Sequence, residues 1–360
     1  MSATQTNPLR VVIIGYGLGG AVFHAPLVAS TPGMVVAGIV TANDARQQQA
    51  QHDFPEARIH RTAEEIWQSP KDYDLVVITT SNRWHAPFGL AAMQAGLPVV
   101  IDKPFASSVA EVQALLACSA STGVSLTCFQ SRRLDGDFLT VQQILAKDLL
   151  GPVFAFESRF ERFRPQIKQD AWRELTAPED AGGLLFDLGS HLIDQAIQLF
   201  GIPERVVAQM AQRRPGAQVD DDTFVALEFA NGTTARLWMS AITRIAGPRF
   251  VLHGLHGSYV KYGLDPQEDA LQIGDRPGDA GWGVEARAAW GNMVTEVNGV
   301  VIDGDVETLP GAYERYYASV RDALQQHTPM PVDPADALLT ARVIAAAQRS
   351  VQTHAAETLI

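Results

Sequence analysis

A glycine-rich turn directly after the first apolar run is the feature that most constrains this chain. Residues Leu9–Ile14 are mostly branched and apolar, and Gly15, Gly17 and Gly20 follow them at G-x-G-x-x-G spacing. A segment of helical composition near 21–30 comes next. A strand, a tight glycine turn and a helix in this order let the backbone approach a pyrophosphate, which the N–H groups and dipole of the helix N-terminus then favour. The spacing predicts a dinucleotide-binding turn.

The first third of the chain alternates between short apolar runs and helical segments. Further apolar runs occupy Met34–Val40, Leu75–Thr79, Pro98–Ile101 and Val124–Cys128. Helical segments between them include Asp44–Asp53, Trp84–Ala95 and Ser107–Ser121. This order predicts a parallel sheet with helices on both faces, and the nearly continuous apolar character of the runs is typical of strands buried on both sides. We expect this α/β domain to cover residues 1–130.

The pattern changes after residue 130 to longer alternating stretches separated by turn signals. They occupy Val153–Phe163, Val206–Gln212, Thr223–Phe229, Thr233–Ser240, Phe250–His253 and Ser258–Tyr262. Asn231-Gly232 between two of them is a strong hairpin signal. Helices are expected near Asp137–Lys147 and at Asp333–Thr353, and a surface loop at Gly274–Asn292. Residues 131–360 are therefore predicted to form an α+β domain with a large, mostly antiparallel sheet.

Charge and composition argue against several classes of partner. The formal net charge is −12, and no run of Lys or Arg stands against it. We expect neither nucleic-acid nor membrane binding, because nucleic acids and anionic lipid surfaces attract a basic face and no apolar run is long enough to span a bilayer. The two cysteines lack metal-ligand spacing, so no metal site is predicted. The N-terminus has no apolar targeting segment, which favours a cytoplasmic protein.

The end of the second apolar run bears on the choice of nucleotide. NAD-binding chains tend to place an acid there for the ribose 2′-OH, but this position is Thr41. Thr41, Asn43 and Arg46 could bind a 2′-phosphate, which favours NADP. Asp44 could instead reach the ribose, so NAD stays possible.

Polar residues also follow the next two apolar runs. The third run leads into Thr80 and Asn82, with His85 shortly after them, and the fourth leads into Lys103. Ligands of open parallel sheets bind beyond the carboxyl ends of the strands, so we expect all four residues at the cofactor. A lysine there suits proton transfer or stabilisation of a substrate oxygen. The alternative is an ordinary surface lysine.

A second polar group lies within an apolar helical segment. Asp187, His191 and Asp194 stand at i, i+4 and i+7 and form one polar stripe. The Asp187 carboxylate could orient the His191 imidazole and raise its basicity, which favours catalysis over a purely structural histidine. Both residues are expected to contact the substrate.

Three more residues are candidates for ligand contact. Trp172 and Arg173 lie in a loop-like segment before that helix, where they could bind cofactor or could only pack and pair. Arg133 lies at the junction between the two predicted domains and is expected to contact the substrate.

Taken together, these residues resemble the Gfo/Idh/MocA family of oxidoreductases over the whole chain, and within it the bacterial NADP-dependent scyllo-inositol dehydrogenases. The segments that carry the resemblance are Gly15-Tyr16-Gly17-Leu18-Gly19-Gly20, Asp102-Lys103-Pro104, Trp172-Arg173, and Gly182-Gly183 followed by Asp187 and His191. The resemblance implies a Rossmann domain, an open-faced sheet domain, and a homodimer or homotetramer formed through that sheet. It places the family's lysine, aspartate and histidine on Lys103, Asp187 and His191, and Tyr16 and Leu18 among the cofactor-binding residues.

Two positions depart from the family pattern. The residue before the lysine is Asp102 rather than the usual Glu, and Asn43 stands where some inositol enzymes have an arginine.

The expected function is hydride transfer between NADP, or NAD, and a secondary alcohol of a cyclitol or sugar. His191 would be the general base, Asp187 would orient it, and Lys103 would stabilise the reacting oxygen. The alternatives are reduction of a keto- or anhydro-sugar, transient oxidation in a glycosidase, and a redox-silent NADP-binding sensor.

Overall fold

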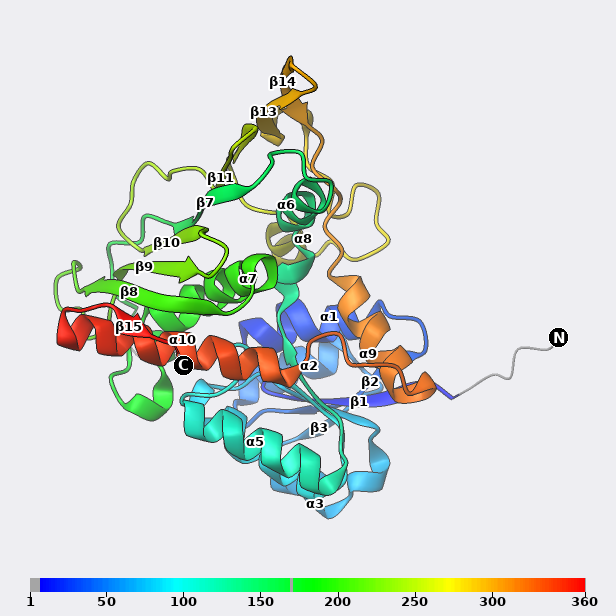
Figure 1. Cartoon of the computed structure of the whole chain (residues 1–360). Helices are drawn as coiled ribbons and strands as arrows, with labels where there is room; N and C mark the ends of the chain where they lie inside the picture. The colour runs from blue at the N-terminus through cyan, green and yellow to red at the C-terminus, as the bar shows by residue number, and fades with distance from the viewer. Residues whose placement is uncertain (1–6, 169–170, 360) are drawn as a thin grey trace. The chain divides into compact units, whose positions relative to one another are not determined.

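The computed structural model describes residues 7–168 and 171–359, with the backbone alone for Trp172, and the chain divides into two compact units (Figure 1). The first contains the chain up to Ser131 with Gln267–Trp282 and Ala312–Ala337. The second contains Arg132–Pro266, Gly283–Gly311 and the chain from Leu338 onward.

The first unit is built on a six-stranded sheet in the order β3-β2-β1-β4-β5-β6. Its strands are β1 Leu9–Ile14, β2 Met34–Val40, β3 Arg58–His60, β4 Leu75–Ile78, β5 Val99–Asp102 and β6 Leu126–Phe129. Every neighbouring pair is parallel. The order reverses between β1 and β4, which is where such sheets bind nucleotides. The predicted Rossmann domain is confirmed.

The ends of the helices in this unit follow from capping residues, as α5 shows. The helices are α1 Ala25–Ala29, α2 Asp44–Asp53, α3 Glu64–Gln68, α4 His85–Gln94, α5 Val109–Thr122, α8 Gln267–Ile273 and α9 Glu314–Gln326. Ser108 caps α5, since its Oγ accepts the N–H of Glu111 at 3.2 Å. Gly123 ends the helix at a φ of +69°.

Helix α9 belongs to the first unit although it follows most of the second in sequence. The Tyr316 ring meets Phe129 edge-on with centroids 4.8 Å apart, and the Tyr316 hydroxyl donates to the Cys128 carbonyl at 2.7 Å. The Tyr317 hydroxyl lies 2.6 Å from Nδ1 of the buried His24. The domain boundaries predicted from sequence assign α9 to the second domain, whereas in the structure its aromatic side chains pack against the end of β6 in the first unit.

The second unit contains a nine-stranded sheet in the order β14-β13-β12-β11-β7-β10-β9-β8-β15. Its strands are β7 Val153–Glu161, β8 Pro203–Ala211, β9 Asp222–Phe229, β10 Thr234–Ser240, β11 Phe250–Gly254, β12 Gly257–Lys261, β13 Gly291–Val297, β14 Val300–Val306 and β15 Glu357–Thr358. Only β7 and β10 pair in parallel among its strands. The predicted hairpin forms at Asn231-Gly232, and the mostly antiparallel sheet is confirmed.

Three helices pack their apolar sides on one face of this sheet. They are α6 Gly136–Ala146, α7 Ser190–Phe200 and the larger part of α10 Pro334–Thr353. Alternation along β9 and β10 directs one set of side chains into this core. The alternate set, including Phe224 and Trp238 with ring centroids 5.2 Å apart, lies on the opposite, partly exposed face.

A buried arginine joins this sheet to two of its helices. Arg249 is 2% exposed, and its guanidinium donates to Ser158 Oγ at 2.5 Å and to Gln195 Oε1 at 2.8 Å. Its Nε lies 3.5 Å from Asp137 Oδ2, and the ring of Phe160 lies 4.2 Å from the guanidinium carbon. These partners come from β7, α7 and α6, so one cation orders all three elements.

We expect Arg249→Ala to lower the free energy of unfolding by about 3–5 kcal/mol, because removing one partner leaves buried polar groups uncompensated. Urea unfolding measures this. The control is Arg205→Ala, which removes an exposed ion pair with Glu228 on the same sheet and should change stability by less than about 1 kcal/mol. Similar losses in both variants would contradict the role given to Arg249.

Candidate functional site

Two of the three glycines in the predicted nucleotide turn are required because other backbone atoms pack closely against them. Gly15 has a φ of +106°, and a Cβ there would overlap the carbonyl oxygen of Thr79. A Cβ on Gly20 would overlap the carbonyl oxygen of Gly15. Gly17 differs, since the nearest atom to its Cβ position is Nη1 of Arg46 at 3.6 Å. Gly15 and Gly20 close the turn, whereas a side chain at Gly17 would meet only the Arg46 guanidinium.

The helix after this turn starts with a π-helical segment, Gly19–His24 (η1), and continues as α1. π-helical turns often occur at functional sites. The side chain of Leu18 before it is 52% exposed, whereas Tyr16 is buried and its hydroxyl donates to Asp53 at 2.9 Å. Burial, with the hydrogen bond to Asp53, raises the pKa of Tyr16.

The one acidic residue just after β2 in the described structure, Asp44, is exposed but paired with a cation. Asn43 caps α2, where its Oδ1 accepts the N–H of Arg46 at 3.0 Å. Asp44 pairs with Arg61 at 2.8 Å, a residue that the sequence did not single out. Thr41 is buried and its carbonyl accepts a hydrogen bond from Gln47 at 2.7 Å. The exposed guanidinium of Arg46 lies against the glycine turn, so a cation faces the predicted nucleotide turn.

His85 joins the loops that follow β4 and β5. Its Nδ1 lies 2.8 Å from the Pro104 carbonyl oxygen, and its Nε2 lies 3.3 Å from the Thr80 carbonyl oxygen. Burial lowers the pKa of His85, and a neutral imidazole has one N–H, so it donates to one of these oxygens at a time. Asn82 is buried beside it in the same loop.

Asp102 fixes the start of the loop that carries Lys103. Its Oδ1 accepts the N–H of Lys103 at 2.8 Å, and its Oδ2 accepts the Thr79 hydroxyl at 3.2 Å. His24 Nε2 lies 3.5 Å from the same oxygen. Burial alone would raise the pKa of Asp102, but the neighbouring His24 and the positive charge of Lys103 outweigh it and hold that pKa below its usual value.

In the second unit, the segment with Asp187 and His191 begins at two tightly packed glycines. A Cβ on Gly182 would overlap the Leu175 carbonyl oxygen, and one on Gly183 would overlap the Asp220 carboxylate. Asp220 Oδ2 accepts the N–H of Leu185 at 2.8 Å. Burial raises the pKa of Asp220.

The predicted helix exists, but its first turn is π-helical. Asp187 lies in the π-helical turn Leu185–Gly189 (η7), and His191 is the second residue of α7. Both are largely buried, at 9% and 6% exposure. The Asp187 carboxylate pairs with Nε of Arg173 at 2.8 Å, and the His191 ring lies edge-on to Phe160 with centroids 6.3 Å apart. The structure therefore joins Arg173 to Asp187, which the sequence had not paired.

The third member of the polar stripe, Asp194, pairs with Arg133. The two hydrogen bonds of this pair measure 2.8 and 2.5 Å, and both side chains are largely buried. The predicted contact of Arg133 with substrate remains a prediction. The side chain of Trp172 lies outside the described part of the structure, so its predicted cofactor contact also remains untested.

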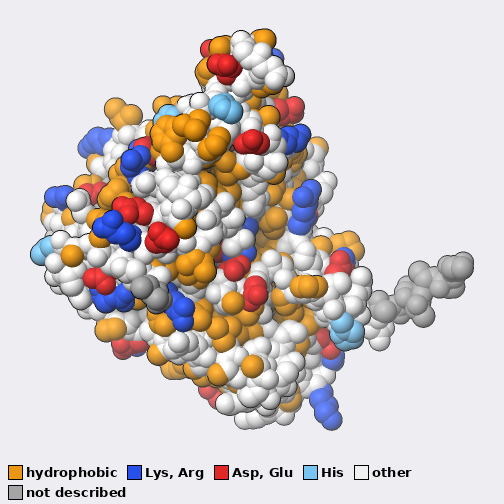
Figure 2. Space-filling view, viewed as in Figure 1, with side chains coloured by type: hydrophobic (Ala, Val, Ile, Leu, Met, Phe, Trp, Pro, Cys, Tyr) orange, Lys and Arg blue, Asp and Glu red, His pale blue; other side chains and the backbone are white. Residues whose placement is uncertain are grey.

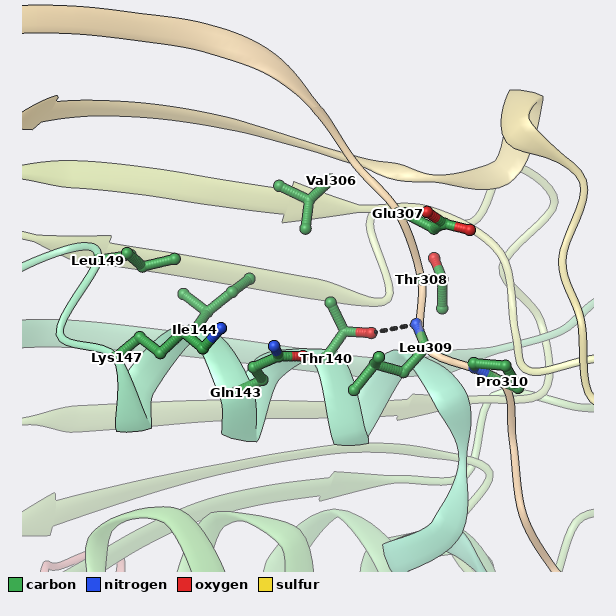
Figure 3. A pocket seen from close by; sticks show the side chains of 10 residues that line it. All are labelled: Thr140, Gln143, Ile144, Lys147, Leu149, Val306, Glu307, Thr308, Leu309 and Pro310. Carbon is green, nitrogen blue, oxygen red and sulfur yellow. Dashed lines mark hydrogen bonds between the residues drawn. The ribbon is translucent and has the colours of Figure 1, made fainter.

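A separate cavity of about 370 Å³ lies in the second unit between α6 and the chain after β14 (Figure 3). Thr140 Oγ1 accepts the N–H of Leu309 at 2.8 Å across it. None of the predicted site residues lines this cavity.

Surface charge and the placement of possible metal ligands in the described residues bear on the possible partners. On the face shown in Figure 2, Lys and Arg are scattered among Asp and Glu rather than gathered in one patch. Among these residues no three His, Cys, Asp or Glu side chains are placed to hold a metal ion. No described helix combines the length and apolar character needed to cross a membrane.

Family comparisons match both parts of the chain. Residues 9–129 match the Gfo/Idh/MocA model for an oxidoreductase family NAD-binding Rossmann fold, and residues 142–358 match its C-terminal alpha/beta domain.

Similar proteins extend over nearly the whole chain. The uncharacterized oxidoreductase YdgJ of Escherichia coli is 39% identical, with 94% of this chain and 95% of the relative covered. The scyllo-inositol 2-dehydrogenase (NADP(+)) IolW of Bacillus subtilis is 34% identical, with 96% and 94% covered. The solved structure of the putative oxidoreductase YvaA from Bacillus subtilis superposes with a TM-score of 0.93 at 32% identity, covering 99% of this chain and 100% of the other.

We expect Gly17→Ala to weaken NAD(P) binding about tenfold or more without unfolding the protein. Its methyl group would stand on the outer surface of the turn, where we expect the nucleotide phosphates to approach, but it would meet no backbone atom. Calorimetric titration and thermal unfolding measure the two effects. Gly20→Ala is the comparison, and it should lower the unfolding temperature because of the overlap with Gly15. A native dissociation constant for Gly17→Ala would rule out phosphate binding at this turn.

Proposed function

We propose that this chain, which belongs to the Gfo/Idh/MocA family of NAD(P)-dependent oxidoreductases, oxidises a secondary alcohol of a cyclitol or sugar with NADP. The observation that carries the substrate class is the match to the protein named scyllo-inositol 2-dehydrogenase, which extends over 96% of this chain. The family also supports assembly as a homodimer or homotetramer through the partly exposed face of the nine-stranded sheet.

His191 acts as the general base in this proposal. A neutral imidazole accepts the hydroxyl proton of the substrate, and burial excludes water that would compete for the same position. Asp187 stabilises the imidazolium that results and orients the ring. Arg173 holds the Asp187 carboxylate at 2.8 Å, which fixes its position.

Lys103 stabilises negative charge on the reacting oxygen in the same proposal. The hydrogen bond from its own N–H to Asp102 fixes the backbone from which the ammonium extends, and a fixed cation needs little reorganisation as charge develops. Bound nicotinamide supplies the hydride acceptor. The glycine turn fits the pyrophosphate of this cofactor because its glycines admit close backbone approach. Tyr16, Leu18, Thr80, Asn82 and His85 remain predicted cofactor contacts.

The preference for NADP rests on charge at the end of β2. Arg46 presents a guanidinium next to the glycine turn, and Thr41 and Asn43 add polar groups without negative charge. Asp44 would repel a 2′-phosphate, but it pairs with Arg61 at 2.8 Å, which offsets part of its charge. This leaves a positive balance where the 2′-phosphate would bind.

The experiment that tests the function is a panel of inositols and aldoses, each assayed with NAD and NADP by nicotinamide absorbance. We expect turnover of at least one polyol. Lys103→Ala, purified identically, is the control for contaminating enzymes, and its kcat should fall about 10²-fold or more. Turnover confined to keto- or anhydro-sugars would replace this proposal with a reductase, and no turnover with any compound would favour a sensor.

We expect Thr41→Asp to shift the cofactor preference towards NAD, because a new carboxylate would repel the 2′-phosphate and could bind the ribose hydroxyls. The ratio of kcat/KM for the two nucleotides measures the shift. Thr41→Asn adds a side chain of the same size without charge and should keep the native ratio. A native enzyme with higher kcat/KM for NAD would refute the NADP assignment.

Asp187 and His191 should behave as one unit in catalysis. We expect His191→Ala to nearly abolish oxidation and Asp187→Asn to impair it, while the double variant is little worse than His191→Ala alone. Oxidation by the native enzyme should also decrease at acidic pH, because a protonated imidazole cannot accept the proton. Steady-state rates across pH measure both effects. Fully additive losses would show that the two residues act independently.

A further inference from the structure

Residues 171–183 form a strap that leads into the π-helical turn η7. The strap contains the 3-10 turn Trp172–Glu174 (η5). The N–H of Gly183 donates to the carbonyl oxygen of Arg173 at 2.9 Å, so the two ends of the strap are joined. Because Arg173 is part of η5, a contact that fixes η5 also fixes the backbone position of Arg173.

Arg214, in the segment between β8 and β9, holds η5 in place. Its two terminal nitrogens donate to the two carboxylate oxygens of Glu174, each at 3.0 Å, and its Nε donates to Asp221 at 2.9 Å. The Arg214 and Glu174 side chains are only 7% and 18% exposed. A guanidinium is always charged, and its planar fork matches a carboxylate through two parallel hydrogen bonds. The contact is therefore both strong and directional.

The far end of this contact is fixed to the sheet. Asp221 is fully buried and also accepts the N–H groups of Arg213 at 2.6 Å and of Arg214 at 2.9 Å. Its own N–H donates to the carbonyl oxygen of Ala211, the last residue of β8, at 3.0 Å. The strap is thus tied through one arginine to a rigid strand end.

The strap places the Arg173 side chain next to the Asp187 carboxylate. Arg173 is the neighbour of Glu174, and its side chain is 44% exposed, whereas that of Asp187 is 12% exposed. A half-exposed ion pair contributes little to stability when the side chains and backbone that carry it must first be ordered. With η5 already held by Arg214, the pairing of Arg173 with Asp187 does not have to offset the entropy of ordering the backbone.

We propose that Arg214 is a positioning residue, which through Glu174 fixes the strap so that Arg173 holds the Asp187 carboxylate beside His191. The catalytic consequence rests on the proposed function, whereas the ordering of the strap does not.

Hydrogen exchange of the native protein tests the ordering of the strap. Glu174→Gln is the first variant, because it leaves the buried pair of Arg214 and Asp221 in place. Arg214→Lys is the second, since an ammonium cannot form the two parallel bonds. We expect the Gly183 amide to exchange about tenfold faster in both, which corresponds to about 1.4 kcal/mol of local opening. Native protection of Gly183 in Glu174→Gln would overturn the proposal.

The matched control for both variants is Arg213→Gln. Arg213 adjoins Arg214 in sequence, but its side chain is 59% exposed and pairs with Asp222 on the surface. Its removal should leave both the exchange of Gly183 and the turnover at the native level. Faster exchange in this control would mean that any charge lost from the segment loosens the strap, which also overturns the specific role of Arg214.

Kinetics test whether the strap acts through Asp187. Glu174→Gln should lower kcat about tenfold with little change in the substrate KM, because misplacement affects the reacting groups more than binding. In an Asp187→Asn background the same substitution should have almost no further effect. Additive losses would show that the strap does not act through Asp187. If the native enzyme oxidises no polyol or sugar, the proposed function fails, and the exchange experiment still decides whether Arg214 orders the strap.

Discussion

The central strands of the parallel sheet are buried on both faces, and the chemistry of the first unit follows from this. Residues 11–14 of β1, all of β4 and the first three residues of β5 are buried, and the polar side chains of these strands lie at the strand ends. The carboxyl ends of β1, β4 and β5 accordingly carry the glycine turn, Thr79 and Asp102. Because these strands are neighbours in the sheet, residues far apart in sequence meet at one edge, as the Thr79–Asp102 hydrogen bond shows.

The sheet of the second unit differs from the parallel sheet, because only one of its faces packs against a hydrophobic core. Helix α7 carries several polar side chains into that core, and two of them serve the fold: Asp194 pairs with Arg133, and Gln195 accepts from Arg249. Asp187 stands at the helix start instead, where its partner Arg173 is half-exposed. Asp194 and Gln195 therefore hold α7 on the sheet, whereas Asp187 and His191 are the pair that we assign to catalysis.

Local patterns were sufficient to predict most strands of both sheets, the glycine turn and the helix with Asp187 and His191, but not the short strands β3 and β15. They were insufficient for β13 and β14, because β14 is exposed along nearly its whole length and has no buried side to impose alternation. The turn Asn298-Gly299, with φ of +53° and +79°, was the available signal. Helix α9 was also missed, although Tyr313, Tyr316, Tyr317 and Val320 follow helical spacing and are all buried.

The sequence by itself determined most of the strands and helices and their order, the glycines that close the predicted nucleotide turn, and the residue types available at the strand ends. Those features depend on neighbours in the chain, through side-chain period, turn geometry and capping. Only the tertiary structure decided the partners: Arg61 for Asp44, Arg173 for Asp187, Arg133 for Asp194, and Arg214 for Glu174. A charged side chain has no preference among opposite charges until folding sets distances and burial, so these pairings leave no local pattern to read.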